Sequence, residues 1–148
     1  MSTSSRFAVA VHVLTLMAWA GDEPIKSEQI AASVNTNPVV IRRILCALAR
    51  AGLVTSQTGA AGGSKLARKP SQITLLDVYQ AVEGGGVFSL HRQRPSHRCP
   101  VGSSIGVVLE GVLEEVSLAV EQVLEKITVE KALQRLQRCS GQARKKLR

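Results

Sequence analysis

Hydrophobic residues recur at helical spacing in two neighbouring segments of the first third of the chain. Residues 27–34 (SEQIAASV) place Ile30, Ala31 and Val34 on one side of a short helix. A second run repeats apolar residues at three- and four-residue steps: Val40, Ile41, Ile44, Leu45, Leu48 and Ala51. The intervening Asn35-Thr36-Asn37 is typical of a turn, because these side chains hydrogen-bond their own backbone. The pattern therefore predicts two helices joined by a tight turn.

Residues at the ends of these runs have the chemistry of helix caps. Ser27 is expected to cap the first helix, because its hydroxyl can accept from a free backbone N–H. Pro38 suits the first position of the second helix, and Gly52 suits its end. Residues 53–67 then favour two strands joined by the glycine-rich turn at 59–63. This order predicts a winged helix-turn-helix, mainly α with a small β-hairpin, which presents one helix to the DNA major groove.

The polar side of the second helix separates this interpretation from the alternative, an ordinary core of a small α/β domain. Amide and guanidinium groups hydrogen-bond base edges and phosphates. The residues expected to read bases lie at the start of that helix: Asn37, Val39, Val40, Arg42 and Arg43. The residues expected to contact phosphates lie around it: Ser5, Arg6, Lys26, Ser27 and Lys65, with the backbone amides of Gly62 and Gly63. A solvated arginine face is the alternative for Arg42, Arg43 and Arg50.

The apolar run at residues 7–20 (FAVAVHVLTLMAWA) has two interpretations. Arg6 before it and the small residues at its end imitate a signal peptide with its cleavage site. We favour a buried first helix of the winged domain, because His12 and Thr15 interrupt the run and it is too short to span a bilayer. We expect His12 and Trp19 to lie in the core, and the protein to be cytoplasmic without membrane contact.

A further helix and a long irregular segment are predicted after the hairpin. Thr74 is expected to cap a helix that runs to Glu83, with Tyr79 in the core. Residues 84–102 are rich in Gly, His and Arg and predict a flexible loop. The winged helix-turn-helix domain is therefore expected to span residues 1–83.

A long amphipathic helix is predicted from Ser103 to about Lys126. Its apolar residues recur at a spacing near 3.6: Ile105, Val108, Leu109, Val112, Val116, Ala119, Val123 and Ile127. We expect this face to pack against a second copy of the chain, because the small winged domain cannot cover it and helix-turn-helix proteins usually bind two half-sites as dimers. With a shorter helix at 129–136, residues 103–137 are expected to be dimerisation helices, and the basic residues 138–148 a disordered tail.

The charge balance is strongly basic and the cysteines are few. The net charge of +8 and the pI of about 10.0 fit a polyanionic partner. Residues 1–70 hold eight Lys or Arg against three Asp or Glu, and a further basic cluster lies in residues 144–148. The three cysteines Cys46, Cys99 and Cys139 form no CxxC pair, so their spacing predicts no metal site. So sparse a set suggests a reducing compartment.

The chain resembles the Rrf2 family of bacterial transcription regulators. The resembling segments are SSRFAVAVHVLTLMA, IAASVNTNPVVIRRILCALARAGLV, TGAAGGSKLARKPSQITLLDVYQAVEG and CPVGSSI, and they run along most of the chain. The resemblance implies a homodimeric winged helix-turn-helix regulator, usually a repressor, whose long helix crosses between subunits. A palindromic operator in double-stranded DNA is then the expected partner, with a redox or small-molecule signal.

Two features depart from the family pattern. Several Rrf2 members hold an iron–sulfur cluster through three cysteines in the loop before the long helix, whereas this loop has Cys99 alone. His91 and His97 are possible ligands, but clusters are held mostly by thiolates. We therefore expect no cofactor. The chain resembles the cluster-free branch of the family, which keeps the CPVG motif. Many members also carry Arg before the wing glycine. Here Thr58 precedes Gly59, so readout is expected to depend more on the recognition helix.

Cys99 is the candidate for a redox-sensing thiol. Neighbouring positive charge at His97 and Arg98, and a helix start, lower a thiol pKa. We favour the alternative, a cysteine that packs beneath the loop. We expect Cys139 to be exposed.

Enzymatic activity is not expected, because no GxSxG, HExxH, P-loop or dinucleotide motif occurs. The remaining alternative is a protein-interaction module that binds a metabolic enzyme or another regulator through the loop and the long helix.

Overall fold

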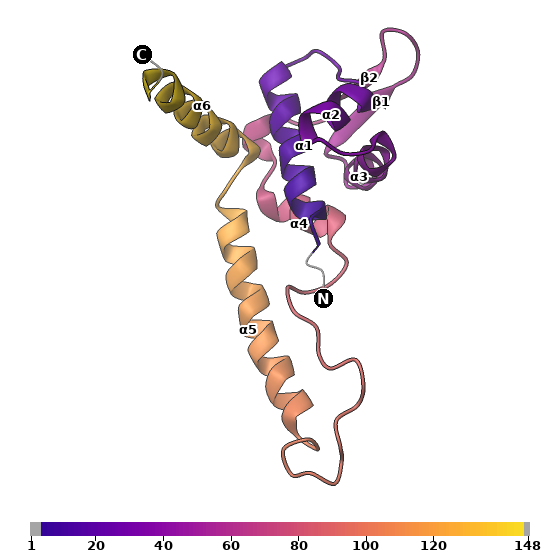
Figure 1. Cartoon of the computed structure of the whole chain (residues 1–148), viewed down its shortest axis with the longest axis vertical. Coiled ribbons are helices and arrows are strands. Elements are labelled where there is room, and N and C mark those ends of the chain that lie inside the picture. Colours follow the sequence, from indigo (N-terminus) through magenta and orange to yellow (C-terminus); the bar gives the residue numbers. More distant parts are fainter. Residues whose placement is uncertain (1–3, 147–148) are drawn as a thin grey trace.

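The helices and the hairpin follow each other in the order that the sequence predicts (Figure 1). The computed structural model describes residues 4–146, and the side chains of residues 4–141. Within that range the elements are α1 (Arg6–Ala20), α2 (Ser27–Val34), α3 (Pro38–Arg50), β1 (Val54–Gln57), β2 (Gly63–Leu66), the 3₁₀ turn η1 (Pro70–Gln72), α4 (Leu75–Val82), α5 (Ile105–Glu125) and α6 (Val129–Lys146). The predicted winged helix-turn-helix fold is confirmed.

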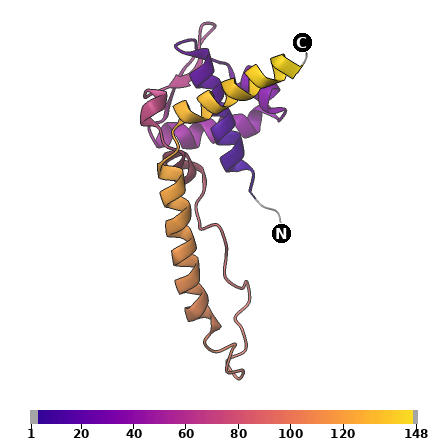
Figure 2. The same cartoon turned by 90° about the vertical axis from the view of Figure 1, so that its left-hand side faces the viewer.

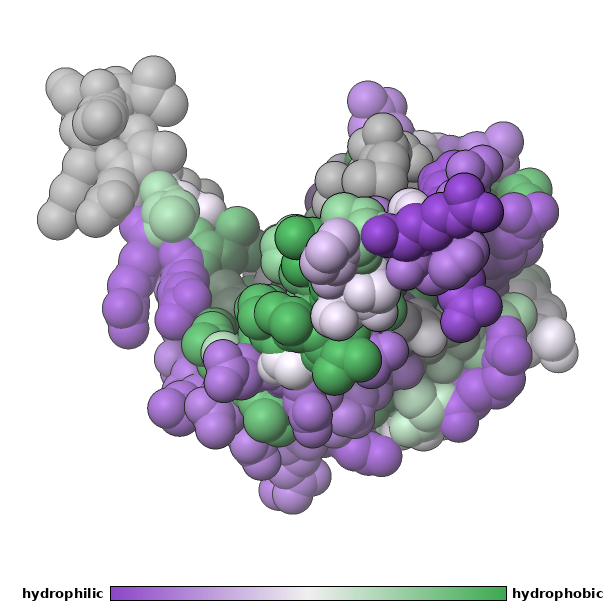
Figure 3. All heavy atoms as spheres, turned by 90° about the horizontal axis from the view of Figure 1, so that it is seen from below, coloured by the Kyte–Doolittle hydropathy of each residue, from purple (hydrophilic) through white to green (hydrophobic). Residues whose placement is uncertain are grey.

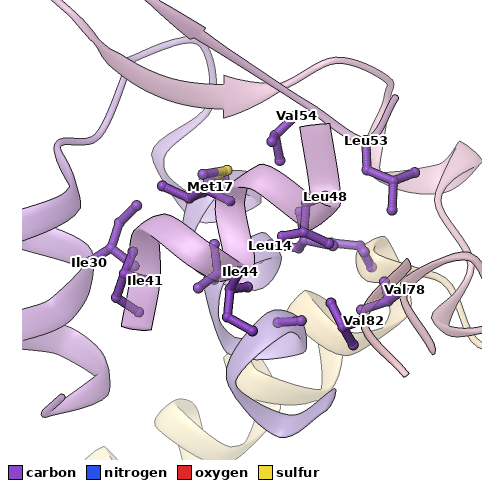
Figure 4. Packing of buried hydrophobic residues seen from close by; sticks show 14 of the residues in the cluster. Leu14, Met17, Ile30, Ile41, Ile44, Leu48, Leu53, Val54, Val78 and Val82 are labelled. Carbon is purple, nitrogen blue, oxygen red and sulfur yellow. The ribbon is translucent and has the colours of Figure 1, made fainter. Parts of the chain in front are cut away.

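One hydrophobic core joins α1 to α2, α3 and α4 (Figure 4). The largest fully buried side chains come from all of these elements and from the segments between them: Leu14, Met17, Ile30, Ile41, Leu48, Leu53, Ile73 and Val78. Full burial of one such side chain contributes roughly 1.5–3 kcal/mol. The same periodicity that predicts each helix therefore also assigns its inner face.

The cap of α2 differs from the sequence prediction, whereas the cap of α4 agrees with it. Ser27 is not the cap of α2 but its first residue, and Lys26 occupies the cap position. The backbone N–H of Lys26 donates to Gln29 Oε1 at 3.0 Å, which stabilises the helix start without a capping hydroxyl. Thr74 caps α4 as predicted: its hydroxyl accepts from the N–H of Asp77 at 3.1 Å, and its own N–H donates to the Asp77 carboxylate at 2.9 Å.

The expectations for aromatic and histidine side chains of the core are partly wrong. Trp19 is 69% exposed, because it lies on the side of α1 away from the core. His12 is also exposed, and its Nε2 lies 2.9 Å from Ser33 Oγ. Tyr79 is half-buried, packs edge-on against Phe7 with ring centroids 6.0 Å apart, and donates to the carbonyl of Gly85. Between residues 4 and 146, no helix combines the length and the apolar character needed to cross a bilayer.

Helix α5 and the loop before it extend away from the winged domain (Figures 1 and 2). No residue of α5 is buried, although the helix is 21 residues long and rich in valine and leucine. It spans Ile105–Glu125, slightly shorter than predicted. Its C-terminal half lies near α4, where Ser117 and Val120 line a shallow hollow with Tyr79.

Helix α6 returns to the winged domain and crosses α1, so the predicted division of the chain needs correction (Figure 2). The N–H of Val129 donates to the carbonyl of Ile73 at 2.9 Å, and the N–H of Leu75 donates to the carbonyl of Ile127 at 2.8 Å. Val129 is fully buried in the core of the winged domain. The start of α6 therefore belongs to that core within one chain.

The expected disordered tail is also corrected. Helix α6 continues past Leu136 to Lys146, so disorder is wrong for residues 138–146. Residues 147–148 lie outside the described range. Cys139 on this helix is exposed, as predicted.

Replacing Val129 with Ala should lower the free energy of unfolding by about 2 kcal/mol, because it removes buried methyl groups from a packed core. Leu136→Ala on the same helix is the matched control. Leu136 is 47% exposed, so its truncation should cost less than about 0.5 kcal/mol. Urea denaturation followed by circular dichroism measures both. Equal effects of the two changes would contradict the packing of α6 on this core.

Candidate nucleic-acid interface

The turn between α2 and α3 fixes the direction in which α3 leaves the domain core. Asn35 adopts the left-handed conformation with φ of 61°, which Asn tolerates better than most residues. The N–H of Thr36 donates back to the carbonyl of Ala31 at 3.0 Å. Asn37 then caps α3, since its Oδ1 accepts from the N–H of Val39 at 2.9 Å. Asn37 thus has a structural role, and its amide nitrogen is still a possible donor.

Helix α3 has one buried and one exposed face. Ile41, Ile44 and Leu48 point into the core in Figure 4, and Leu45 is also buried. Pro38 and Ala47 are partly buried, and the exposed face carries the other side chains of the helix: Val39, Val40, Arg42, Arg43, Cys46, Ala49 and Arg50. Exposed valines beside arginines suit the major groove, where apolar groups contact thymine methyls and guanidinium groups contact guanine.

The two arginines at the centre of this face differ in their partners. Arg42 Nη2 lies 2.9 Å from Glu28 Oε1 of α2, which orients Arg42 across the helix pair. The backbone N–H of Glu28, followed by the charge of Arg42, holds the pKa of the Glu28 carboxyl below its ordinary value. Within the described part of the chain, Arg43 has no ion-pair partner. Arg43 is therefore the guanidinium free to bind an external acceptor.

Sequence reasoning missed Glu28. It is the one acidic residue between positions 24 and 76, so its isolation in a basic domain was a signal that could have marked it. Its carboxylate positions Arg42 rather than contacting a polyanion itself.

Backbone pairing brings the wing beside the start of α2. Strands β1 and β2 pair antiparallel, with Thr55 opposite Lys65. Ile25 adds a further bridge, because its N–H and carbonyl bond the carbonyl and N–H of Ser64 at 2.9 and 2.8 Å. Lys26 follows directly, so it lies next to the strand that carries Lys65. Lys65 itself is half-buried.

The two wing glycines have structural roles. A Cβ on Gly63, whose φ is +147°, would come within 2.9 Å of the Ile25 backbone, so only glycine permits this approach. Gly62 is buried, and its N–H already donates to the carbonyl of Gly59 at 3.0 Å. The expected phosphate contact from the Gly62 amide therefore has no free donor.

Ser5 and Arg6 lie apart from these residues. Arg6 Nη2 is 3.8 Å from the Glu83 carboxylate at the end of α4, and Arg6 Nε donates to Ser4 Oγ. Lys65, in contrast, lies near Gly21 beyond the other end of α1. A helix of 15 residues is about 22 Å long, so Arg6 and Lys65 are far apart on one protomer. In the described residues, no hydrogen bond or ion pair joins Ser5 or Arg6 to the recognition helix.

The contacts combine most of the expected residues into one surface, which we call the recognition surface. It runs from the wing through the start of α2 to the first turns of α3, joined by the Ile25–Ser64 bridge and the Glu28–Arg42 pair. Its members are Lys26, Ser27, Asn37, Val39, Val40, Arg42, Arg43, Gly63 and Lys65.

Cys99 lies outside this surface and is exposed, so its predicted packing beneath the loop is wrong. Backbone N–H groups of Gly102 and Val101 lower the pKa of the Cys99 thiol from its ordinary value. These donors belong to the turn that leads into α5. The neighbouring His97 and Arg98 charges, which the sequence suggested, are not the cause.

Comparisons with known proteins agree with this geometry. Residues 3–135 match the Rrf2 family model, described as an iron-dependent transcriptional regulator. Over 122 residues the chain is 44% identical to Bacillus subtilis YwnA, provisionally named an HTH-type transcriptional regulator, and the match covers 82% of this chain and 89% of YwnA. Among solved structures, a provisionally described DNA-binding protein superposes with TM-score 0.70 and 39% identity, covering 87% of this chain and 99% of that chain. IscR of T. potens superposes with TM-score 0.68 and 25% identity, covering 92% and 88%. The homologues are transcriptional regulators and not enzymes.

The iron in the family description does not fit the residues present. In residues 4–146 no three His, Cys, Asp or Glu side chains gather where they could hold a metal ion. The loop before α5 offers one thiolate, Cys99, and a cluster requires several. We derive no step through an iron centre.

In a Cys46→Ser/Cys139→Ser variant, the pH midpoint for alkylation of Cys99 by iodoacetamide should be lower in the folded protein than in urea. The reason is that the amide donors of the turn favour the thiolate only while the turn is formed. At neutral pH the folded protein should therefore react faster than the unfolded chain. Coinciding midpoints would contradict the contact between Cys99 and these amides.

Proposed function

This chain belongs to the Rrf2 family of transcriptional regulators, and on that premise we propose that it acts in the cytoplasm as a homodimeric repressor that binds a palindromic operator. The observation that supports this proposal most directly is the recognition surface. It exposes two arginines, two valines and an amide at the start of α3, next to Lys26 and Lys65.

The chemistry of this surface divides into base reading and phosphate binding. Arg43 is exposed and free of internal partners, so it is the best candidate for a bidentate contact with guanine. Arg42 donates one N–H group to Glu28, and its remaining N–H groups are available to a second acceptor. Lys26, Ser27 and Lys65, at the start of α2 and on the wing, are proposed to contact phosphates, which position the protein on the duplex without reading sequence.

Dimer formation is proposed through α5. Val108, Val112, Ala119 and Val123 follow each other at four- and seven-residue steps on one exposed side of this helix. The glutamates Glu110, Glu114 and Glu121 lie on another side. Seen from below, hydrophobic side chains gather in a patch surrounded by hydrophilic ones (Figure 3). An apolar helix face of this length, left exposed by its own chain, is typical of an interface between copies.

Repression is proposed as the consequence of operator binding by such a dimer. Two recognition surfaces related by a two-fold axis match a pseudo-palindromic site, and a dimer seated on a promoter excludes polymerase. We propose no iron–sulfur cluster in this mechanism, because the donor set in the loop is insufficient.

Arg43→Ala should reduce discrimination between the operator and a scrambled duplex by about 1–3 kcal/mol, which is roughly 5- to 150-fold. Lys65→Ala should weaken binding to both duplexes alike and reduce the salt slope by about one. Arg50→Ala is the control, since Arg50 lies in the last turn of α3 and its Nε donates to the carbonyl of Cys46. Fluorescence anisotropy with the promoter region of its own gene, across a salt series, measures all three.

Equal and steeply salt-dependent binding of wild type to both duplexes would contradict operator recognition. A dimer that binds no DNA would favour the alternative of a protein-interaction module, for which the exposed loop residues Val87 and Phe88 offer a surface.

Val112→Glu should convert the dimer to a monomer, because it places a charge in the centre of the apolar face of α5. Glu114→Gln, on the charged side of the same helix, should leave the dimer intact. Sedimentation velocity at micromolar concentration distinguishes the two states. A monomeric wild type, or a Val112→Glu variant that remains dimeric, would overturn the interface.

A further inference from the structure

A hollow lies between the loop and the first turns of α5. These two segments form the end of the molecule farthest from the wing (Figure 1). Its volume is about 810 Å³, within the range of small-molecule sites. The loop contributes the side chains of His91, Arg92, Arg94 and His97, and α5 contributes Gly106 and Glu110. Four nitrogen-bearing side chains therefore face one concave space.

Local contacts order the turn that joins this loop to α5. Gly102 lies so close to Ser96 that a Cβ would collide with the Ser96 carbonyl oxygen. The N–H of Ser103 donates to the carbonyl of Cys99 at 2.9 Å, and Ser103 Oγ donates to the carbonyl of Pro100 at 3.0 Å. Of the side chains that line the hollow, His97 thus lies inside this tied segment, and Arg94 precedes it by two residues.

The ionisable side chains that line the hollow are predominantly basic. Residues 84–109 contain three arginines and no acidic residue, and Glu110 at the edge is the one carboxylate that lines the hollow. In the part of the chain that the structure describes, neither Arg92 nor Arg94 forms an ion pair. Arginine keeps its charge at every relevant pH, so the two guanidinium groups face solvent as cations without an ion-pair partner among the described residues. Such a set is stabilised when an anion binds.

We propose that this hollow binds a small oxyanion with at least two negative charges, either a phosphate or a polycarboxylate. Guanidinium groups bind both through paired N–H···O contacts, and imidazole N–H groups add donors at the side. The concave shape favours a small molecule over duplex DNA, which the recognition surface accommodates at the other end of the protein. The site goes beyond the proposed function, since binding of an anion requires neither DNA nor an operator.

Gly106 gives the hollow its depth. A Cβ at Gly106 would meet no atom within 4 Å, so a larger side chain fits there without disturbing the fold. Gly106→Leu therefore fills the hollow while leaving every charge in place. It separates a shaped site from diffuse attraction of anions to a basic loop.

The test is isothermal titration calorimetry of the full chain, without DNA, with inorganic phosphate in one arm and citrate in the other, at constant ionic strength. Wild type should bind at least one of them saturably, and the tighter one identifies the phosphate or carboxylate class. Arg92→Gln/Arg94→Gln should weaken binding at least tenfold, and so should Gly106→Leu. Arg98→Gln removes one positive charge from the same loop, against two in the double variant, and Arg98 does not line the hollow, so this change should alter Kd less than twofold.

Three results would overturn the site: no saturable binding in either arm, an equal loss in Arg98→Gln, or full affinity in Gly106→Leu. The exchanged arginines are exposed, and circular dichroism melting of each variant checks that it is folded. Since DNA is absent, failure here leaves operator binding untouched, and failure of operator binding leaves this test valid.

Discussion

The burial of one face of α3 against the core is the interaction on which the recognition surface depends. Ile41 and Leu48 are fully buried two turns apart, so the helix cannot rotate about its axis without exposing one of them. Its opposite face, with Arg42 and Arg43, is thereby presented outward. The Ile25–Ser64 bridge adds the wing and the start of α2 to the same surface. Hydrophobic packing thus decides which polar groups are available to DNA.

In contrast to α3, helix α5 and the loop before it have side chains that the rest of their own chain does not bury. Helix α5 buries no residue within its own chain, and its apolar stripe and its charged side are both exposed. The loop before it is tied to the helix start by turn hydrogen bonds, yet carries unpaired arginines. Helix α5 therefore carries both the apolar face proposed for dimer formation and one wall of the basic hollow proposed to bind an anion. A bound anion would contact the first turns of α5, the helix through which we propose that two subunits pair.

Much of the fold was predictable, because helical periodicity and capping residues are local signals. The turn at Asn35, the cap at Thr74 and the glycine-rich wing follow from side-chain chemistry within a few positions. The errors concern partners distant in sequence. Trp19 looked like core because it lies in an apolar run, but periodicity does not state which side of a helix will be covered. The extension of α6 was missed because its polar sequence offers little apolar patterning beyond Leu136.

By itself, the sequence determined the order of elements, the inner faces of α2 and α3, the basic balance and the presence of one cysteine in the loop. These depend on composition and on spacing along the chain, which are local properties. Tertiary structure alone decided that Glu28 holds Arg42 while Arg43 is free, that Gly62 has no amide to offer, and that Arg6 pairs with Glu83. It also placed Val129 in the core of the winged domain. Apart from the local bond between Gly62 and Gly59, each of these is a contact between segments separated in the chain, and its existence depends on how the packed helices orient their side chains.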